Sequence, residues 1–176
     1  QRRIPTYYTD LEEILGANPG HVVGSTACLG GCLATQLLRY GENPDEDFFQ
    51  QIINWCTYLN SLFGQDNFYF ELQPAGSPEQ NYVNRQLIKL SERLNIPYII
   101  TTDSHYLKKE DASIHEAYLN SQDADREVKS FYATTYMMDT KELESYTLTS
   151  DITKEHMQHA YASIRQIADM CEDYSI

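Results

Sequence analysis

An Asp-x-His motif closes an apolar, β-branched run of the chain. The run extends from Pro97 to Thr101, and Asp103 and His105 follow it directly. A buried parallel strand delivers side chains to a ligand at its carboxyl end. If strand geometry continues through the motif, the carboxylate and the imidazole leave the same face and can converge on one cation. The alternative is a strand-to-loop cap, in which Asp103 bonds backbone amides and His105 is merely exposed.

Polar groups also follow two other strands that the sequence predicts. Cys28 comes after the first strand and Gln73 ends the second. Because ligands bind beyond the carboxyl ends of parallel strands, we expect these groups to lie beside the Asp-x-His motif. A thiolate, a carboxylate and an imidazole are all competent zinc ligands. The sequence therefore predicts a metal site formed by Cys28, Asp103 and His105.

Two further side chains are weaker candidates for this site. Glu71 lies inside the second strand, where alternation places it on the face of Tyr69 and Gln73. A salt bridge, or support of a metal ligand from behind, is favoured for Glu71 over direct ligation. His115 follows the motif on a predicted helix and could orient or join the site, although a capped or solvent-facing histidine is the simpler interpretation.

Strands and helices alternate along the first hundred residues. Three strands are expected, at 21–26, 67–73 and 98–101. Helices are expected at 9–16, 33–40, 44–63, 77–94, 109–120, 141–146 and 152–171. Crossover helices of this length require parallel pairing, so the sequence predicts an α/β fold with a parallel sheet. In the helix at 109–120, Ile114, Tyr118 and Leu119 are expected to face the core.

Composition limits what the chain does by itself. Its net charge of −13 argues against holding DNA or RNA by neutralising phosphates, which needs a basic surface. No apolar run approaches the length of a membrane span and no signal segment opens the chain, so no membrane partner is expected. Four cysteines in 176 residues predict neither a disulfide framework nor a zinc finger, which favours a reducing, cytoplasmic location. The first residue is Gln1, which suggests a processed product or a piece of something longer.

Several segments, in the same order along the chain, resemble one known family, the PHP domain of bacterial DNA polymerase III alpha subunits. They are Gly24 to Gly31, Phe68 to Gln73, Glu79-Gln80, Val83-Asn84, Ile96 to Leu107, Glu110-Asp111, His115, Phe131 to Met138 and Ile164 to Cys171. The resemblance implies a distorted (β/α)7 barrel. Residues 1–130 would be the carboxyl-terminal part of that barrel, and residues 131–176 a helical extension leading toward the polymerase palm.

The resemblance also implies a set of metal ligands. In that family nine residues bind a metal cluster, and those that map onto this chain are Cys28, Asp103 and His105. The first ligands of the family come from an H-x-H segment that this chain lacks, and Cys32 stands where the family usually has Glu. Some members use the cluster for zinc-dependent 3′–5′ proofreading, and others keep the domain as a structural part. Zinc or manganese is thus implied for the intact site, which in the isolated chain could stay empty.

Taken together, these features predict part of the alpha subunit of a bacterial or phage DNA polymerase III. The parent would be a DNA-directed DNA polymerase with DNA and other replisome subunits as partners. This chain alone is expected to be inactive and, because a truncated barrel exposes sheet edges, to self-associate. The alternatives are a non-catalytic scaffold of the polymerase and a stand-alone PHP phosphoesterase.

Overall fold

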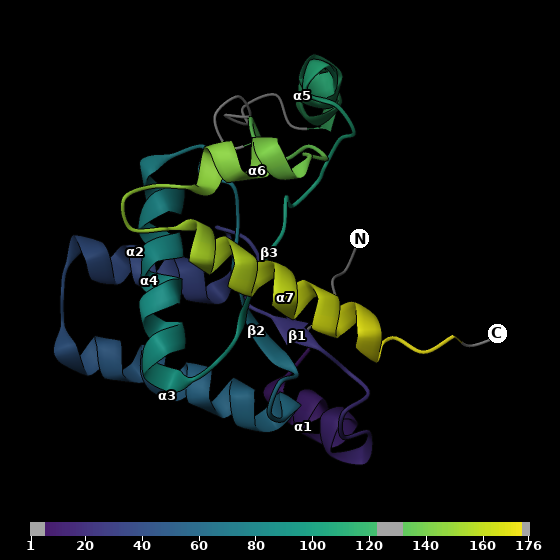
Figure 1. Ribbon diagram of the computed structural model, residues 1–176. Helices are drawn as coiled ribbons and strands as arrows, with labels where there is room; N and C mark the ends of the chain where they lie inside the picture. Colours follow the sequence, from purple (N-terminus) through teal and green to yellow (C-terminus); the bar gives the residue numbers. More distant parts are fainter. Residues whose placement is uncertain (1–5, 123–131, 174–176) are drawn as a thin grey trace.

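Three short strands form a parallel sheet in the order β1-β2-β3. They are β1 (Gly24–Ser25), β2 (Phe68–Leu72) and β3 (Tyr98–Ile100). The computed structural model describes residues 6–122 and 132–173. Helices α2 (Cys32–Glu42) and α3 (Glu46–Phe63) connect β1 to β2, and α4 (Pro78–Leu94) connects β2 to β3 (Figure 1). The α/β class and the parallel pairing predicted from the sequence are confirmed.

The helices begin where the sequence supplies capping groups. Asp45 accepts hydrogen bonds from the backbone N–H groups of Asp47 and Phe48 at the start of α3. Ser77 accepts one from Gln80 at the start of α4, with Pro78 in the first helical position. These side chains satisfy donors that a helix leaves unpaired in its first turn. The caps therefore fix where α3 and α4 begin relative to the strand ends.

One face of β2 forms the centre of the core. Phe68, Phe70 and Leu72 alternate along the strand and are almost fully buried against helices. Burying a side chain of this size stabilises the fold by about 1.5–3 kcal/mol. The helices contribute the partners, among them Leu33, Leu37, Ile52, Cys56, Val83, Leu87, Leu90 and Met157. The alternate positions Tyr69 and Glu71 lie on the opposite face of the sheet.

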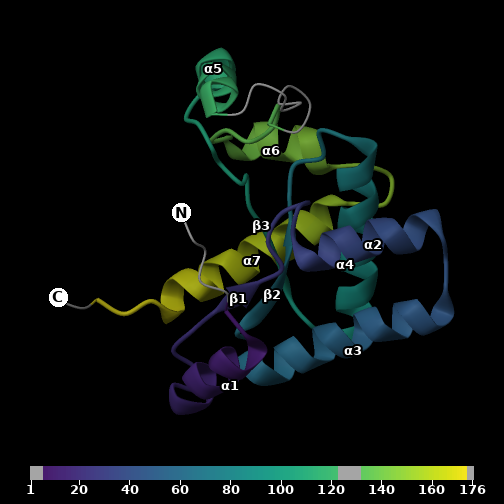
Figure 2. The same ribbon diagram turned by 180° about the vertical axis from the view of Figure 1, so that it is seen from behind.

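The carboxyl-terminal helices belong to the same core. Helix α6 (Thr140–Thr147) is followed by α7 (Lys154–Met170), which runs along β3 in both views (Figures 1 and 2). Met157 and Ala160 of α7 are buried in the core, and the ring of His159 stacks on Tyr98 with 4.5 Å between centroids. The division of the chain at residue 130 stays a prediction, since α7 packs directly on the sheet.

The expected burial of the helix after β3 is wrong. Helix α5 (Ala112–Gln122), with the 3-10 turn Lys109–Asp111 before it, forms as predicted but stands apart from the layers around the sheet (Figure 1). Ile114 is 68% exposed and Tyr118 is 63% exposed, whereas Leu119 is half-buried. Helical spacing of apolar residues predicts a helix but does not say which surface it packs against. No helix in the described parts of the chain is both long and apolar enough to cross a membrane.

Candidate functional site

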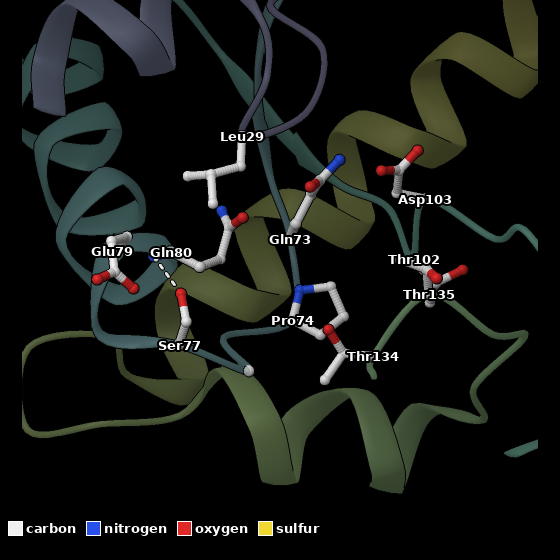
Figure 3. A pocket seen from close by; sticks show the side chains of 11 residues that line it. Leu29, Gln73, Pro74, Ser77, Glu79, Gln80, Thr102, Asp103, Thr134 and Thr135 are labelled. Carbon is white, nitrogen blue, oxygen red and sulfur yellow. Dashed lines mark hydrogen bonds between the residues drawn. The ribbon is translucent and has the colours of Figure 1, made fainter. Parts of the chain in front are cut away.

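The loops that follow the three strands meet at one edge of the sheet. They border a cavity of about 200 Å³, which also includes the start of α4 and residues just before α6 (Figure 3). The residues that line it are Leu29, Gln73, Pro74, Gly76, Ser77, Glu79, Gln80, Thr102, Asp103, Thr134 and Thr135. Leu29 follows β1, Gln73 follows β2 and Asp103 follows β3. This is the arrangement expected for ligand sites in parallel sheets.

The strand does not continue through the Asp-x-His motif, so the condition for both side chains to leave one extended face is not met. Strand β3 ends at Ile100, and Asp103 adopts φ 47°, in the left-handed region that aspartate tolerates better than most residues. Nδ1 of His105 lies 2.6 Å from the backbone oxygen of Asp103, and the backbone N–H of His105 donates to Thr135. The motif is therefore a tight loop whose two side chains are not presented by an extended backbone.

The side chains of Asp103 and His105 consequently lie in different surroundings. The Asp103 carboxylate is half-buried, lines the cavity and accepts no hydrogen bond from the described residues, so the strand-cap alternative is wrong. His105 is exposed and contacts an aromatic group instead. Its ring centroid is 5.8 Å from that of His115 and 5.0 Å from that of Tyr132. Burial, with a smaller contribution from His105, lowers the pKa of His115.

Cys28 lies in the turn between β1 and α2. The backbone N–H of Gly31 donates to the oxygen of Cys28 over 2.7 Å, and a Cβ at Gly31 would come within 2.7 Å of the Thr26 oxygen. Only glycine fits this close approach. Cys28 is half-buried beside Leu29, which lines the cavity.

The described residues do not assemble a complete metal site. Within 6–122 and 132–173, no three histidine, cysteine, aspartate or glutamate side chains lie close enough together to hold a metal ion. The structure thus places Cys28 on the loop after β1, and Asp103 and His105 on the loop after β3, with β2 between the two strands, and does not join the three residues in one coordination sphere. Their role as zinc or manganese ligands stays a prediction.

Glu71 connects all three strands through its carboxylate. One oxygen accepts a hydrogen bond from Ser25 over 2.5 Å, and the other accepts from Thr101 over 2.6 Å and from Gln73 over 3.3 Å. No cation among the described residues pairs with it, so these residues give no support to a salt bridge, and support of a metal ligand from behind stays a prediction. Ser25 precedes the Cys28 turn and Thr101 precedes the Asp103 loop. Hydrogen bonds to a carboxylate are stronger than neutral ones, and here they fix the two loops relative to each other.

A buried amide group that sequence reasoning missed fixes the end of β2. Asn84 of α4 is fully buried. Its Nδ2 donates to the backbone oxygen of Gln73 over 2.7 Å. Its Oδ1 accepts from the backbone N–H of Gln73 and from Nε2 of Gln80. Gln80 and Asn84 are four residues apart, on the stripe that also carries Val83 and Leu87. Amides on an otherwise apolar helical stripe were the signal that could have found them.

Comparison with known proteins relates the chain to DNA polymerases. The "DNA-directed DNA polymerase" of Bacillus phage SPbeta is 39% identical over 184 aligned residues, covering 99% of this chain and 14% of the relative. "Probable DNA polymerase YorL" of Bacillus subtilis gives the same values. "DNA polymerase III subunit alpha" of Borreliella burgdorferi is 28% identical over 159 residues, covering 88% of this chain and 13% of the relative. No protein-family model matches the chain.

The chain is therefore homologous to one region of larger DNA polymerases. More particularly, its homologues are DNA polymerase III alpha subunits and a related phage enzyme, as the sequence motifs indicated. It spans 14% of the length of the two relatives that match it over 99% of its residues.

Proposed function

We propose that this chain is the PHP-type region of a DNA-directed DNA polymerase of the DNA polymerase III alpha kind. The observation that supports this most is similarity along 99% of the chain to a phage DNA polymerase. The parallel sheet, with three loops meeting at its carboxyl edge, suits part of a (β/α)7 barrel. Nucleotide addition would then take place in a palm outside this chain, and DNA and other replisome subunits would be partners of the whole polymerase.

The strand-end loops are proposed to contribute to a 3′–5′ hydrolytic site on DNA. Support comes from Asp103, whose half-buried carboxylate lacks a partner among the described residues, from His105 two residues later, and from Cys28 next to Leu29, which lines the cavity. These three residues are the proposed ligands for zinc or manganese. Because the described residues do not gather them, further groups must complete the site, and the isolated chain is proposed to be inactive.

Elemental analysis and a nuclease assay on the complete protein test this proposal. We expect bound zinc or manganese and release of a 3′-terminal nucleotide from single-stranded DNA, both lost in Asp103→Asn and Cys28→Ser. Asparagine is the informative replacement at position 103, because it removes the charge yet tolerates the left-handed backbone. Asp66→Asn is the matched control, since Asp66 is exposed and has φ 63°.

Two results would overturn parts of the proposal. A complete protein that binds no metal and hydrolyses no 3′ end would remove the hydrolytic role. Hydrolysis by the isolated chain with added zinc or manganese, abolished by Asp103→Asn, would overturn the proposed inactivity of the chain.

A non-catalytic scaffold is the second candidate function. The observation in its favour is that the described residues hold no three-ligand cluster. In that case the complete protein extends DNA normally without bound metal at this edge, and Asp103→Asn leaves extension unchanged. Loss of metal binding in the same variant argues against the scaffold.

A further inference from the structure

Helix α1 (Tyr8–Ala17) is held on α3 by hydrogen bonds along one of its faces. The hydroxyl of Tyr8 accepts a hydrogen bond from Nε1 of Trp55 over 2.8 Å. Glu12, one helical turn further along, accepts a hydrogen bond from the hydroxyl of Tyr58 over 2.7 Å. The rings of Tyr8 and Tyr58 also meet edge to face, with 5.8 Å between their centroids. The orientation of α1 on the molecule is therefore fixed, and so are the sides that it presents to solvent.

The flank of α1 next to this contact is apolar. Tyr7, Leu11 and Ile14 recur at i, i+4 and i+7, so they form one stripe along the helix, the apolar flank. Tyr7 is 63% exposed, Ile14 is 52% exposed and Leu11 is half-buried. Val22 and Val23, which lead from α1 to β1, are exposed as well. Figures 1 and 2 both show α1 at the periphery of the molecule beside α3, and exposed apolar side chains gathered in this way are typical of a surface that contacts a partner.

Carboxylates border the apolar flank on the side away from α3. Helical spacing puts Asp10 beside Tyr7 and Ile14, and Glu13 next to Asp10 around the helix. Neither α1 nor α3 contains lysine or arginine, and the described residues 6–84 hold ten aspartates and glutamates against one such cation, Arg39. DNA, an anionic lipid surface or a second copy of this face would be repelled, whereas a partner that carries lysine or arginine would be attracted.

Two exposed tyrosines also suit a basic partner. Tyr7 lies on the apolar flank, and Tyr8 beside it is 48% exposed. A lysine or arginine over a tyrosine ring gains cation–π attraction, and tyrosine and arginine are enriched among the residues that dominate binding energy at interfaces. Spacing at i, i+4 and i+7 is the spacing with which one helix packs along another. The apolar stripe, its acidic border and the tyrosine rings together match a basic amphipathic helix.

We propose that the apolar flank of α1 docks a basic amphipathic helix of another protein. The apolar side chains of that helix would pack on Tyr7, Leu11 and Ile14. Its lysines or arginines would lie beside Asp10 and Glu13 and over the tyrosine rings. This docking depends neither on metal nor on hydrolysis at the strand ends.

Peptide binding to the complete protein tests this proposal. The probe is a synthetic, fluorescently labelled peptide with leucine at i, i+3, i+4 and i+7 and lysine at the other positions. Its binding is followed by fluorescence anisotropy at physiological salt in the presence of EDTA. We expect saturable binding that is about tenfold tighter than that of a scrambled peptide of the same composition, because only the amphipathic peptide can bury its leucines while its lysines face the acidic border.

Two variants separate the apolar and the charged parts of the surface. Ile14→Ser removes apolar contact and should weaken the leucine–lysine peptide about fivefold. Ile114→Ser on α5 is the matched control, since it removes another isoleucine that is more than half exposed, and should leave binding unchanged. Glu13→Lys reverses an exposed charge and leaves the apolar stripe intact, so it should weaken binding about threefold. This second variant keeps the test decisive should Ile14→Ser fold poorly.

Several results would overturn the proposal. They are no saturable binding by the complete protein, equal affinity for the scrambled peptide, and undiminished binding in both Ile14→Ser and Glu13→Lys. Dimerisation of the complete protein in sedimentation, abolished by Ile14→Ser and without peptide binding, would assign the flank to a second copy and overturn the proposal too. Because EDTA is present throughout, peptide binding is independent of the proposed hydrolytic site, and the two proposals fail separately.

Discussion

The carboxyl edge of the sheet and the segment around α5 are held by different kinds of interaction. At the edge, Glu71 and Asn84 make short hydrogen bonds among buried or half-buried groups, backed by the apolar face of β2. Around α5, His105 and His115 meet through ring contacts of 5 to 6 Å, and Ile114 faces water. The edge is thus determined by many groups at once, whereas the α5 segment depends on a few exposed contacts.

The largest expected effect comes from removing the buried hydrogen bonds that Asn84 makes to Gln73 and Gln80 at the edge. Asn84→Leu leaves the Gln73 backbone N–H and oxygen and the Gln80 amide without their partner. Each unsatisfied buried group is costly, so we expect the free energy of unfolding to fall by about 3 kcal/mol. Urea denaturation followed by circular dichroism measures this loss. The comparison is His115→Gln in the α5 segment, which should lower the free energy of unfolding by less than about 1 kcal/mol. Equal losses in the two variants would erase the contrast between the regions.

An alkaline pH series adds the buried core behind the edge to this comparison, through Tyr98 at the start of β3. Burial, with smaller contributions from Glu92 and Glu155, raises the pKa of Tyr98 to about 12. The unfolded chain releases this proton near pH 10, so the folded state binds more protons between these values and stability falls as pH rises. We expect a loss on the order of 1–2 kcal/mol across that window, reduced in Tyr98→Phe. Burial, followed by Cys32, also raises the pKa of Cys56 to about 12, which leaves a residual slope in the variant.

Removing the charge at the centre of the edge should have a moderate effect. Glu71→Gln keeps the shape but replaces one accepting oxygen by a donor that cannot pair with the hydroxyl hydrogen of Ser25 or Thr101. A loss of about 1 kcal/mol is expected by thermal or urea unfolding. Glu13→Gln, exposed on α1 (Tyr8–Ala17), should stay within about 0.5 kcal/mol. A neutral Glu71→Gln would show that the carboxylate does not hold the strands together.

The smallest effect on stability is expected on α5. Ile114→Ser changes a side chain that is 68% exposed, so the unfolding free energy should change by less than about 0.5 kcal/mol. Self-association of the isolated chain stays a prediction; if exposed apolar side chains cause it, the same variant should reduce it in light scattering. A destabilisation above about 2 kcal/mol would mean that α5 packs into the core in solution.

The sequence predicts the alternating strands and helices because each is encoded by local spacing and capping, as at Ser77 before α4. The start of α3, expected at residue 44, is instead capped by Asp45. The sequence also predicts that the loops carrying Cys28 and Asp103 leave the same edge of the sheet, since parallel strands align their carboxyl ends, although β2 lies between these two strands. It does not show that Asp103 adopts a left-handed backbone, and it fails at Ile114, where helical spacing carries no information on the packing partner. The orientation of Gln73 and Gln80 depends on Glu71 and Asn84 together, and such a network appears only in three dimensions.

The bonds that Glu71 makes to Ser25 and Thr101 have a consequence for local opening. The backbone N–H of Thr26 donates to the oxygen of Tyr69, and Thr26 follows Ser25, whose hydroxyl donates to Glu71. The backbone N–H of Thr101 donates to the oxygen of Leu72, and the hydroxyl of Thr101 also donates to Glu71. Opening either loop would release the shared carboxylate from one of its donors. The two amide protons should therefore exchange with solvent at similar rates, as one cooperative unit that comprises the entrances to both loops.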